Sequence, residues 1–258
     1  MRSSILGGFL VLGLMVGIFQ VINYFDLYSR AIIFEAGSAM NSSGDSLKTF
    51  FELATEIGTD KVTTHSYQHA YELYLPSLRH KPVKMLEIGL GCGMPYGPGK
   101  SLDLWDRYLT HPNSSIFFIE YDEVCAKEWE NKIKRGERIK IASGDQANVT
   151  MLNDFIRNYG SEFDFIIDDG GHTMVQQITS FQNLFLSLKN GGLYFLEDLQ
   201  TSYWENYGGG YLRNDTTIEY IKSMIDGFYG LGSATDITGH LQSIHCFHEI
   251  CVFTKKLS

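Results

Sequence analysis

Short apolar segments alternate with helix-patterned stretches along most of this chain, and that alternation restricts the fold more than any other feature. The apolar segments have the length and composition of buried strands and span 83–88, 115–120, 138–142, 163–168 and 193–197. Apolar residues recur at helical spacing in the intervening stretches 101–108, 124–134, 148–159 and 175–188. Strands separated by helices predict an α/β chain with a doubly wound, mostly parallel sheet that carries helices on both faces.

The last two apolar segments, 244–247 and 250–255, lie too close together for a crossover helix. Parallel strands need a connection of about a dozen residues or more, so these two segments can pair only as an antiparallel hairpin. We therefore expect a seven-stranded sheet that finishes with an antiparallel C-terminal hairpin. The sequence Asn190-Gly-Gly predicts the end of the helix that precedes the fifth strand.

The first 30 residues differ in character from the rest. No charged residue occurs from Ser3 to Phe25, and about 20 apolar residues suffice to cross a bilayer. We therefore expect one N-terminal transmembrane helix, an anchor within residues 1–30. A cleaved signal peptide is the main alternative, because Arg2 supplies a short basic segment, and a buried core helix is a second. Residues 31–57 predict a stem with a leading helix, and residues 58–258 predict one domain.

Charge and glycosylation motifs bear on partners and location. With 21 basic and 30 acidic residues, the formal net charge is −9, which argues against nucleic acid as a partner. Four Asn-X-Ser/Thr motifs begin at Asn41, Asn113, Asn148 and Asn214, with coincidence as the alternative explanation. Together with the apolar run, they predict a single-pass membrane glycoprotein of the endoplasmic reticulum or Golgi, with the folded domain in the lumen.

A glycine-rich turn follows the first predicted strand. Gly89, Gly91 and Gly93 allow the backbone to approach a ligand closely, and Glu87 places a carboxylate beneath the turn. The third glycine falls one position too early for the dinucleotide motif G-x-G-x-x-G, where Met94 stands instead. The carboxylate favours a cationic or amine-bearing ligand over a pyrophosphate, with a tight structural turn as the alternative.

Acidic and amide side chains end the next two strands. Glu120 ends the second strand, where it can accept hydrogen bonds from both hydroxyls of a ribose, although an acidic residue at a strand end is common. Asp145 and Gln146 follow the third strand, where their side chains can meet an adenine ring. Together with the glycine turn, these residues predict a pocket for a nucleoside.

Carboxylates gather after the fourth and fifth strands. Asp168 and Asp169 follow one strand, His172 comes after two glycines, and Glu197 and Asp198 end the other strand. Crowded carboxylates repel one another unless a cation holds them, and an oxygen cluster suits Mg²⁺, Mn²⁺ or Ca²⁺ better than zinc. Helix capping is the alternative for some of the acids, above all Asp168. Because an imidazole is suited to proton transfer near pH 7, we expect His172 to be a general base rather than a structural histidine.

Three segments of the chain resemble a known family. They are Met85-Leu-Glu-Ile-Gly-Leu-Gly, Ile167-Asp-Asp-Gly-Gly-His and, most specifically, Gly192-Leu-Tyr-Phe-Leu-Glu-Asp-Leu-Gln-Thr-Ser-Tyr-Trp. They are similar to segments of the metal-dependent sugar O-methyltransferases of macrolide biosynthesis, the mycinamicin type, which are class I S-adenosylmethionine enzymes. The resemblance runs from about Gly58 to Lys256 and includes Thr59-Asp-Lys, His65 and Tyr67. One departure is Gly171, where that family usually has a serine.

The resemblance implies a Rossmann-like seven-stranded fold and a role for four residues of the acid and histidine group, whereas the residues assigned to the donor come mainly from their positions at the strand ends. It implies that Asp169, Glu197 and Asp198 bind the metal, Mg²⁺ or else Mn²⁺, and that His172 is the catalytic base. The residues assigned to the donor, S-adenosylmethionine, are Glu87, Gly89, Gly91, Gly93, Glu120, Asp145, Gln146 and Asp168. The acceptor is then a sugar hydroxyl, on a small molecule or on a glycan. A homo-oligomer is compatible with the resemblance.

Two other functional classes stay open. A membrane-anchored, metal-dependent glycosyltransferase that uses a nucleotide sugar is one, because Glu120-Tyr-Asp mimics the acidic metal motif of such enzymes. A non-catalytic binding module is the other.

Several further residues receive mainly structural interpretations. Cys246 and Cys251 are taken as ordinary strand positions of the terminal hairpin rather than as zinc ligands, and Cys92 as a small filler in the glycine turn. Tyr203 and Trp204 either line an acceptor pocket or pack against the protein. Residues 208–212 predict a mobile loop that can act as a lid.

Overall fold

The computed structural model describes residues 47–133, 138–231 and 236–257. The predicted membrane helix, most of the stem and the motif at Asn41 lie outside the described residues. Among the residues that are described, no helix is both long and apolar enough to span a bilayer.

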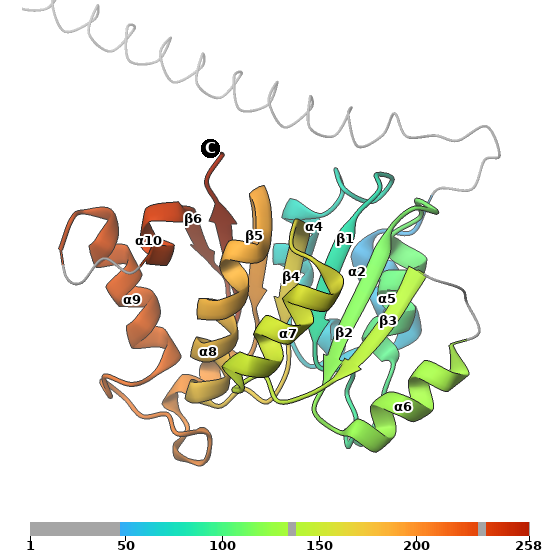
Figure 1. Cartoon of the computed structure of the whole chain (residues 1–258), viewed down its shortest axis with the longest axis horizontal. Helices are drawn as coiled ribbons and strands as arrows, with labels where there is room; N and C mark the ends of the chain where they lie inside the picture. The colour runs from blue at the N-terminus through green and yellow to red at the C-terminus, as the bar shows by residue number, and fades with distance from the viewer. Residues whose placement is uncertain (1–46, 134–137, 232–235, 258) are drawn as a thin grey trace, which may run out of the picture. The chain divides into compact units, whose positions relative to one another are not determined.

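The centre of the fold is a seven-stranded sheet with the strand order β3-β2-β1-β4-β5-β7-β6 (Figure 1). The first five strands pair in parallel, whereas β7 lies antiparallel between β5 and β6. The predicted mostly parallel sheet with an antiparallel C-terminal hairpin is therefore confirmed. The strands are β1 (Lys84–Ile88), β2 (Ser115–Glu120), β3 (Ile139–Ser143), β4 (Phe163–Asp168), β5 (Leu188–Leu196), β6 (Leu241–Cys246) and β7 (Cys251–Lys255).

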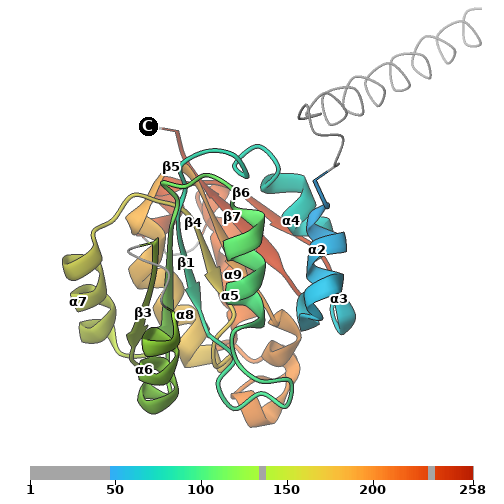
Figure 2. The ribbon, with the colours of Figure 1, turned by 90° about the vertical axis from the view of Figure 1, so that its right-hand side faces the viewer.

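Helices cover both faces of the sheet (Figures 1 and 2). Successive residues of a strand face opposite sides, so Met85 enters a core shared with α2, α4 and α5, while Leu86 enters a second core shared with α7, α8 and α9. The α-helices are α2 (Phe50–Ile57), α3 (Asp60–Thr63), α4 (Gln68–Tyr74), α5 (Lys100–Tyr108), α6 (Glu123–Lys132), α7 (Val149–Tyr159), α8 (Met174–Leu184), α9 (Thr217–Phe228) and α10 (Asp236–His240). Within the described residues, the 3₁₀ helices are η2 (Phe185–Ser187), η3 (Leu199–Tyr203) and η4 (Glu205–Tyr207).

The register of the parallel strands aligns their carboxyl ends. Ile88 of β1 pairs with Asp168 of β4, and Asp168 pairs with Leu196 of β5. The residues that follow these three positions therefore emerge side by side at one edge of the sheet. Ligands of open α/β sheets bind at this edge, so the register itself brings the glycine turn next to the acidic segments.

The segment before the fifth strand differs from its prediction. The helix expected over 175–188 ends at Leu184 and continues as η2, and Asn190-Gly-Gly lies inside β5 instead of ending a helix. Gly191 has a φ of 76°, and the pairing of β4 with β5 shifts its register between Phe163 and Phe165. The glycines thus accommodate an irregularity of the sheet. An Asn-Gly-Gly sequence indicates such an irregularity as readily as it indicates a helix end. Neither α9 nor α10 was predicted.

All four cysteines form disulfides, which corrects the interpretation of Cys92, whereas Cys246 and Cys251 do lie at strand positions of the terminal hairpin. Cys92 of the glycine turn is bonded to Cys125 of α6, so it is not a small filler. Cys246 and Cys251 are bonded to each other across the terminal hairpin. The first pair joins segments 33 residues apart in the sequence, and spacing alone does not predict such a partner.

Candidate active site

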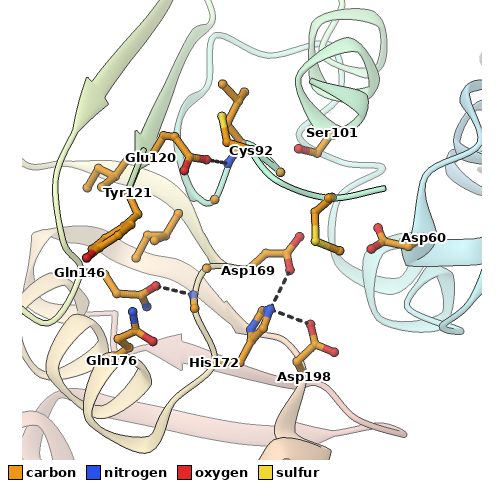
Figure 3. Close-up of a pocket in the computed structure, with 18 of the residues that line it drawn as sticks. Asp60, Cys92, Ser101, Glu120, Tyr121, Gln146, Asp169, His172, Gln176 and Asp198 are labelled. Atoms are coloured by element: carbon orange, nitrogen blue, oxygen red, sulfur yellow. Dashed lines mark hydrogen bonds and ion pairs between the residues drawn. The ribbon is translucent and has the colours of Figure 1, made fainter. Parts of the chain in front are cut away.

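A cavity of about 750 Å³ opens at the carboxyl ends of the parallel strands (Figure 3). One half is lined by the glycine turn after β1 and by the ends of β2 and β3. The other half is lined by the loops after β4 and β5 and by residues of α3 and η4. The cavity therefore connects the predicted nucleoside residues with the predicted acidic cluster.

Gly89 lets the turn after β1 run directly against the loop after β4. Its φ is 100°, and a Cβ atom at this position would lie 2.0 Å from the carbonyl oxygen of Asp169. Gly89 and Gly91 both line the cavity, as predicted for a donor-binding turn. Gly93 has a positive φ but is not among the cavity-lining residues of the described chain, so the structure does not place it in the pocket.

Glu120 faces the cavity at the end of β2. One of its carboxylate oxygens accepts a hydrogen bond from the Leu90 amide and the other from the Asp122 amide, each at 2.9 Å. These contacts fix the carboxylate while its remaining lone pairs are available to a ligand, because an ionised carboxylate has about four acceptor positions. Asp145 also lines the cavity and accepts from the Ala147 amide at 2.8 Å.

Gln146 lines the cavity, but Asp168 does not. The Gln146 side chain donates to Asp168 at 2.9 Å and accepts from the Gly171 amide at 2.8 Å. Asp168 is fully buried and also accepts from Ser180 and from Tyr194. Burial raises the pKa of Asp168 to about 6, although these hydrogen bonds oppose the shift. The predicted donor contact of Asp168 is thus corrected: the residue is buried behind the pocket and orients Gln146.

Asp169, His172 and Asp198 come together in the other half of the cavity (Figure 3). The Nε2 atom of His172 lies 3.4 Å from Asp198 and 4.0 Å from Asp169. One ligand atom from each of these residues lies within 4.8 Å of the others. His172 and Asp198 both have a positive φ, 58° and 55°, a conformation that is uncommon outside glycine and is often found at functional sites.

This donor set fits a divalent cation. Two carboxylates supply the oxygen ligands that Mg²⁺ and Mn²⁺ prefer, and an imidazole is acceptable to Mn²⁺. In addition, Nδ1 of His172 is buried and has no hydrogen-bond partner within the described part of the chain. Buried polar atoms normally have a partner, but the ring nitrogen that faces the two aspartates is Nε2, so the fit to a cation rests on the donor set itself.

Lys61 of α3 contacts Asp169 of this cluster from beneath the pocket. Its ammonium group lies 2.7 Å from Asp169, 2.8 Å from Glu197 and 3.1 Å from Glu87, and the side chain is 1% exposed. Burial alone would lower the pKa of Lys61, but the three carboxylates together raise it well above its usual value. Lys61 is therefore a charged counter-ion for the acidic edge of the sheet.

Glu87 and Glu197 consequently lie behind the cavity. Glu87 is fully buried and also accepts from the indole of Trp105 at 2.7 Å, which corrects its predicted contact with the donor. Glu197 is 1% exposed and accepts from Tyr71 as well as from Lys61. The structure groups Asp169 and Asp198 with His172 instead, and metal ligation by Glu197 stays a prediction.

Residues upstream of the sheet hold Asp198 in place. Tyr67 donates to the Asp198 carboxylate at 3.2 Å and accepts from the Asp198 amide at 3.1 Å. His65 lies 3.6 Å from Asp198 through Nε2 and 2.8 Å from Glu249 through Nδ1. Lys61, His65 and Tyr67 belong to the resembling segments, but the sequence indicates no role for them, and no sequence pattern points to Glu249.

Gly171, where the resembling family has serine, is tightly enclosed. A Cβ atom there would lie 2.2 Å from Oε1 of Gln176, the residue that closes a capping box with Thr173 at the start of α8. Glycine at this position therefore lets the Gln176 side chain pack directly against the backbone before α8. The adjacent His172 still lies in the cluster with Asp169 and Asp198.

Comparisons with known proteins find relatives over most of the chain. The chain is 33% identical over 179 residues to the 8-demethyl-8-alpha-L-rhamnosyl tetracenomycin-C 2'-O-methyltransferase of Streptomyces olivaceus, covering 69% of this chain and 45% of the relative. It is also 33% identical over 213 residues to the corresponding 8-demethyl-8-(2-methoxy-alpha-L-rhamnosyl)-tetracenomycin-C 3'-O-methyltransferase, covering 80% and 50%. The chain thus spans about half the length of the curated relatives it matches. No protein-family model matches it.

A solved structure with the same arrangement is the MycE methyltransferase from the mycinamycin biosynthetic pathway, in complex with Mg, SAH and mycinamycin VI. The two chains superpose with a TM-score of 0.71 at 27% sequence identity. The match covers 81% of this chain and 55% of that chain.

Proposed function

Because the chain is a homologue of the tetracenomycin and mycinamicin sugar O-methyltransferases and has their fold, we propose that it transfers a methyl group from S-adenosylmethionine to a sugar hydroxyl with the help of a divalent cation. The observation that carries this proposal is the single cavity that joins a nucleoside-type half to an acid and histidine cluster.

The nucleoside half of the cavity is the proposed donor site. Gly89 and Gly91 admit the donor close to the backbone, Glu120 accepts from the ribose hydroxyls, and Asp145 with Gln146 borders the base. S-adenosylmethionine supplies the methyl group as part of a sulfonium cation. The protein's contribution is then to hold the acceptor hydroxyl in line with that group and to exclude water.

The acid cluster is the proposed metal and acceptor site. Asp169 and Asp198 would hold Mg²⁺, with Glu197 as the predicted third ligand, and the ion would lower the pKa of an acceptor hydroxyl bound to it. His172 accepts the acceptor's proton at Nε2, the ring nitrogen that faces both aspartates. Tyr67 and His65 orient Asp198, and the Thr201 hydroxyl holds the backbone of His172 by donating to its carbonyl oxygen.

The structure gives the glycosyltransferase alternative no specific support. Among the described residues, the group of acids and histidine close enough to share a metal ion is Asp169, His172 and Asp198, and it does not include Glu120 or Asp122 of the suggested motif. A non-catalytic module would not require the converging Asp169, His172 and Asp198. We therefore retain the methyltransferase proposal.

Calorimetric titration of the chain with S-adenosylmethionine, in the presence and absence of Mg²⁺, tests the proposal. We expect binding of the donor, and we expect His172→Ala to bind the donor normally while losing methyl transfer to methyl α-L-rhamnopyranoside. A correctly folded chain that does not bind the donor would overturn the proposal and favour nucleotide sugars as the next ligands to test.

The location of the protein is a separate proposal: the N-terminal run anchors the chain in a membrane, and the domain lies in the lumen of the endoplasmic reticulum or Golgi, acting on glycans. Two disulfides support an oxidising compartment, because such bonds are rare in the cytosol. The acceptor asparagines of the three described motifs, Asn113, Asn148 and Asn214, are all exposed.

Expression in a eukaryotic host tests this location. The protein should stay in the membrane fraction after alkaline extraction, and its electrophoretic mobility should shift after removal of N-glycans. An unglycosylated, extractable product would contradict this location.

A further inference from the structure

An aromatic wall borders the cavity next to the acid cluster. Trp204, directly after η3, and Tyr207 of η4 line it, and their ring centroids lie 5.9 Å apart. Trp204 is 47% exposed, so much of its indole has no protein contact. An aromatic side chain of this size normally gains stability by burying its faces, and a half-exposed one at a pocket is suited to contact a ligand.

The wall is rigidly connected to the catalytic cluster. The Thr201 hydroxyl donates to the carbonyl oxygen of His172 at 3.0 Å, and the Trp204 amide donates to the Thr201 carbonyl at 3.0 Å. The Gly209 amide then donates to the Trp204 carbonyl at 2.9 Å, and a Cβ atom on Gly209 would lie 2.4 Å from the Thr201 carbonyl oxygen. The glycines of the predicted loop over 208–212 are therefore folded against η3 and η4, and the backbone of Trp204 is held at a defined position relative to His172.

Polar side chains from the upstream helical segment also line the cavity. Asp60, Thr64 and His65 come from α3 and the residues after it. Asp60 accepts from Tyr96 at 2.6 Å, and His65 contacts Asp198 and Glu249. The cavity beyond the donor residues thus combines an aromatic surface with hydrogen-bonding groups around one acid cluster, a composition that suits an amphipathic ring bearing hydroxyls.

We propose that Trp204 is the platform on which the acceptor sugar binds: a pyranose ring places its apolar C–H face on the indole and directs a hydroxyl toward Asp198 and His172. Tyr207 extends this platform, and Asp60 and Thr64 bind the other hydroxyls of the ring. The inference rests on the proposed methyltransferase function and adds the residue that selects a ring-shaped acceptor. Trp204 contributes to acceptor binding and takes no part in proton transfer.

Neighbouring residues of the full chain provide a matched test. Tyr203 is 48% exposed, close to the value for Trp204, but it does not line the cavity. We therefore compare Trp204→Ala, Trp204→Phe and the control Tyr203→Ala. The probe is methyl α-L-rhamnopyranoside, which carries the sugar present in the names of the tetracenomycin relatives. Its binding is followed by saturation-transfer NMR with S-adenosylhomocysteine bound, and its methylation by steady-state kinetics.

The expected result is a KM for the rhamnoside that is about tenfold higher or more in Trp204→Ala, with a much smaller change in kcat. Trp204→Phe should recover part of the loss, because a smaller aromatic face remains, and Tyr203→Ala should match the unaltered chain. All variants should bind S-adenosylmethionine equally well, which shows that they are folded and separates this inference from the proposed function.

Three outcomes would overturn the platform. One is an unchanged KM in Trp204→Ala, and a second is an equal loss in Tyr203→Ala. The third is a donor-loaded, unaltered chain to which the rhamnoside does not bind. Failure of every variant, and of the unaltered chain, to bind the donor would instead overturn the proposed methyltransferase function and this inference with it.

Discussion

A pair of glycine substitutions tests whether close backbone contact holds the donor turn against the acidic loop. Gly89 and Gly93 both have positive φ values, 100° and 83°, but their surroundings differ. A Cβ atom on Gly89 would lie 2.0 Å from the Asp169 carbonyl oxygen, whereas a Cβ atom on Gly93 would meet nothing within 4 Å. Gly93→Ala therefore serves as the control that carries the backbone cost without the collision.

The expected energies follow from these two environments. The left-handed region costs an L-residue about 1–2 kcal/mol, and we expect Gly93→Ala to lose about that much stability. Gly89→Ala adds a collision with backbone that can be relieved only by separating β1 from the loop after β4, at about 1–3 kcal/mol more. For a domain of this size, the extra loss corresponds to a melting temperature lower by about 2–12 °C.

Thermal unfolding of the two variants, followed by circular dichroism, measures this difference directly. Donor affinity should also fall more in Gly89→Ala than in Gly93→Ala, because only Gly89 lines the cavity. Equal melting temperatures for the two variants would refute the argument that close approach, rather than backbone conformation alone, requires glycine after β1.

Three further predictions concern the charges of the site. Lys61→Met should destabilise the chain by about 3–5 kcal/mol in denaturant unfolding, because it leaves buried carboxylates without their counter-ion; Lys127→Met, at an exposed helical ion pair, should change stability by less than about 0.5 kcal/mol. Glu120→Ala should weaken donor binding by about tenfold or more in calorimetry, since a charge-assisted hydrogen bond is lost; an unchanged affinity would exclude Glu120 from the donor site. Removal of divalent cations by EDTA should abolish turnover and leave the fold intact, and Mg²⁺ should restore activity; full activity in EDTA would contradict the metal proposal.

The sheet and the edge that carries the pocket could be predicted from the sequence because both depend on local patterns. Apolar strands alternating with helices define a parallel sheet, and the residues after each strand necessarily share one edge. His172 and Asp198 could therefore be placed together although 26 positions separate them in the sequence. The sequence pattern around residue 190 is ambiguous, because a Gly-Gly pair is as typical of a helix end as of an irregularity within a strand.

The contacts that decide burial could not be predicted, because they depend on the packing of distant segments. Lys61 precedes Asp169 by 108 residues and Glu197 by 136 residues, and no periodicity relates them. Without that lysine, Glu87 and Glu197 look equivalent to the acids that line the cavity. The partner of Cys92 was hidden for the same reason, since α6 approaches the glycine turn only in the folded chain.

The position of Lys61 also determines what a smaller version of this protein must retain. A fragment beginning at β1 would contain every strand and both sheet faces, and by topology it would count as a complete domain. It would nevertheless bring Glu87, Asp169 and Glu197 together without the Lys61 ammonium group that pairs with all three in the full chain. The short helical segment ahead of the first strand is therefore an integral component of the folding unit, and trimming experiments should retain it through Tyr71, whose hydroxyl group also reaches Glu197.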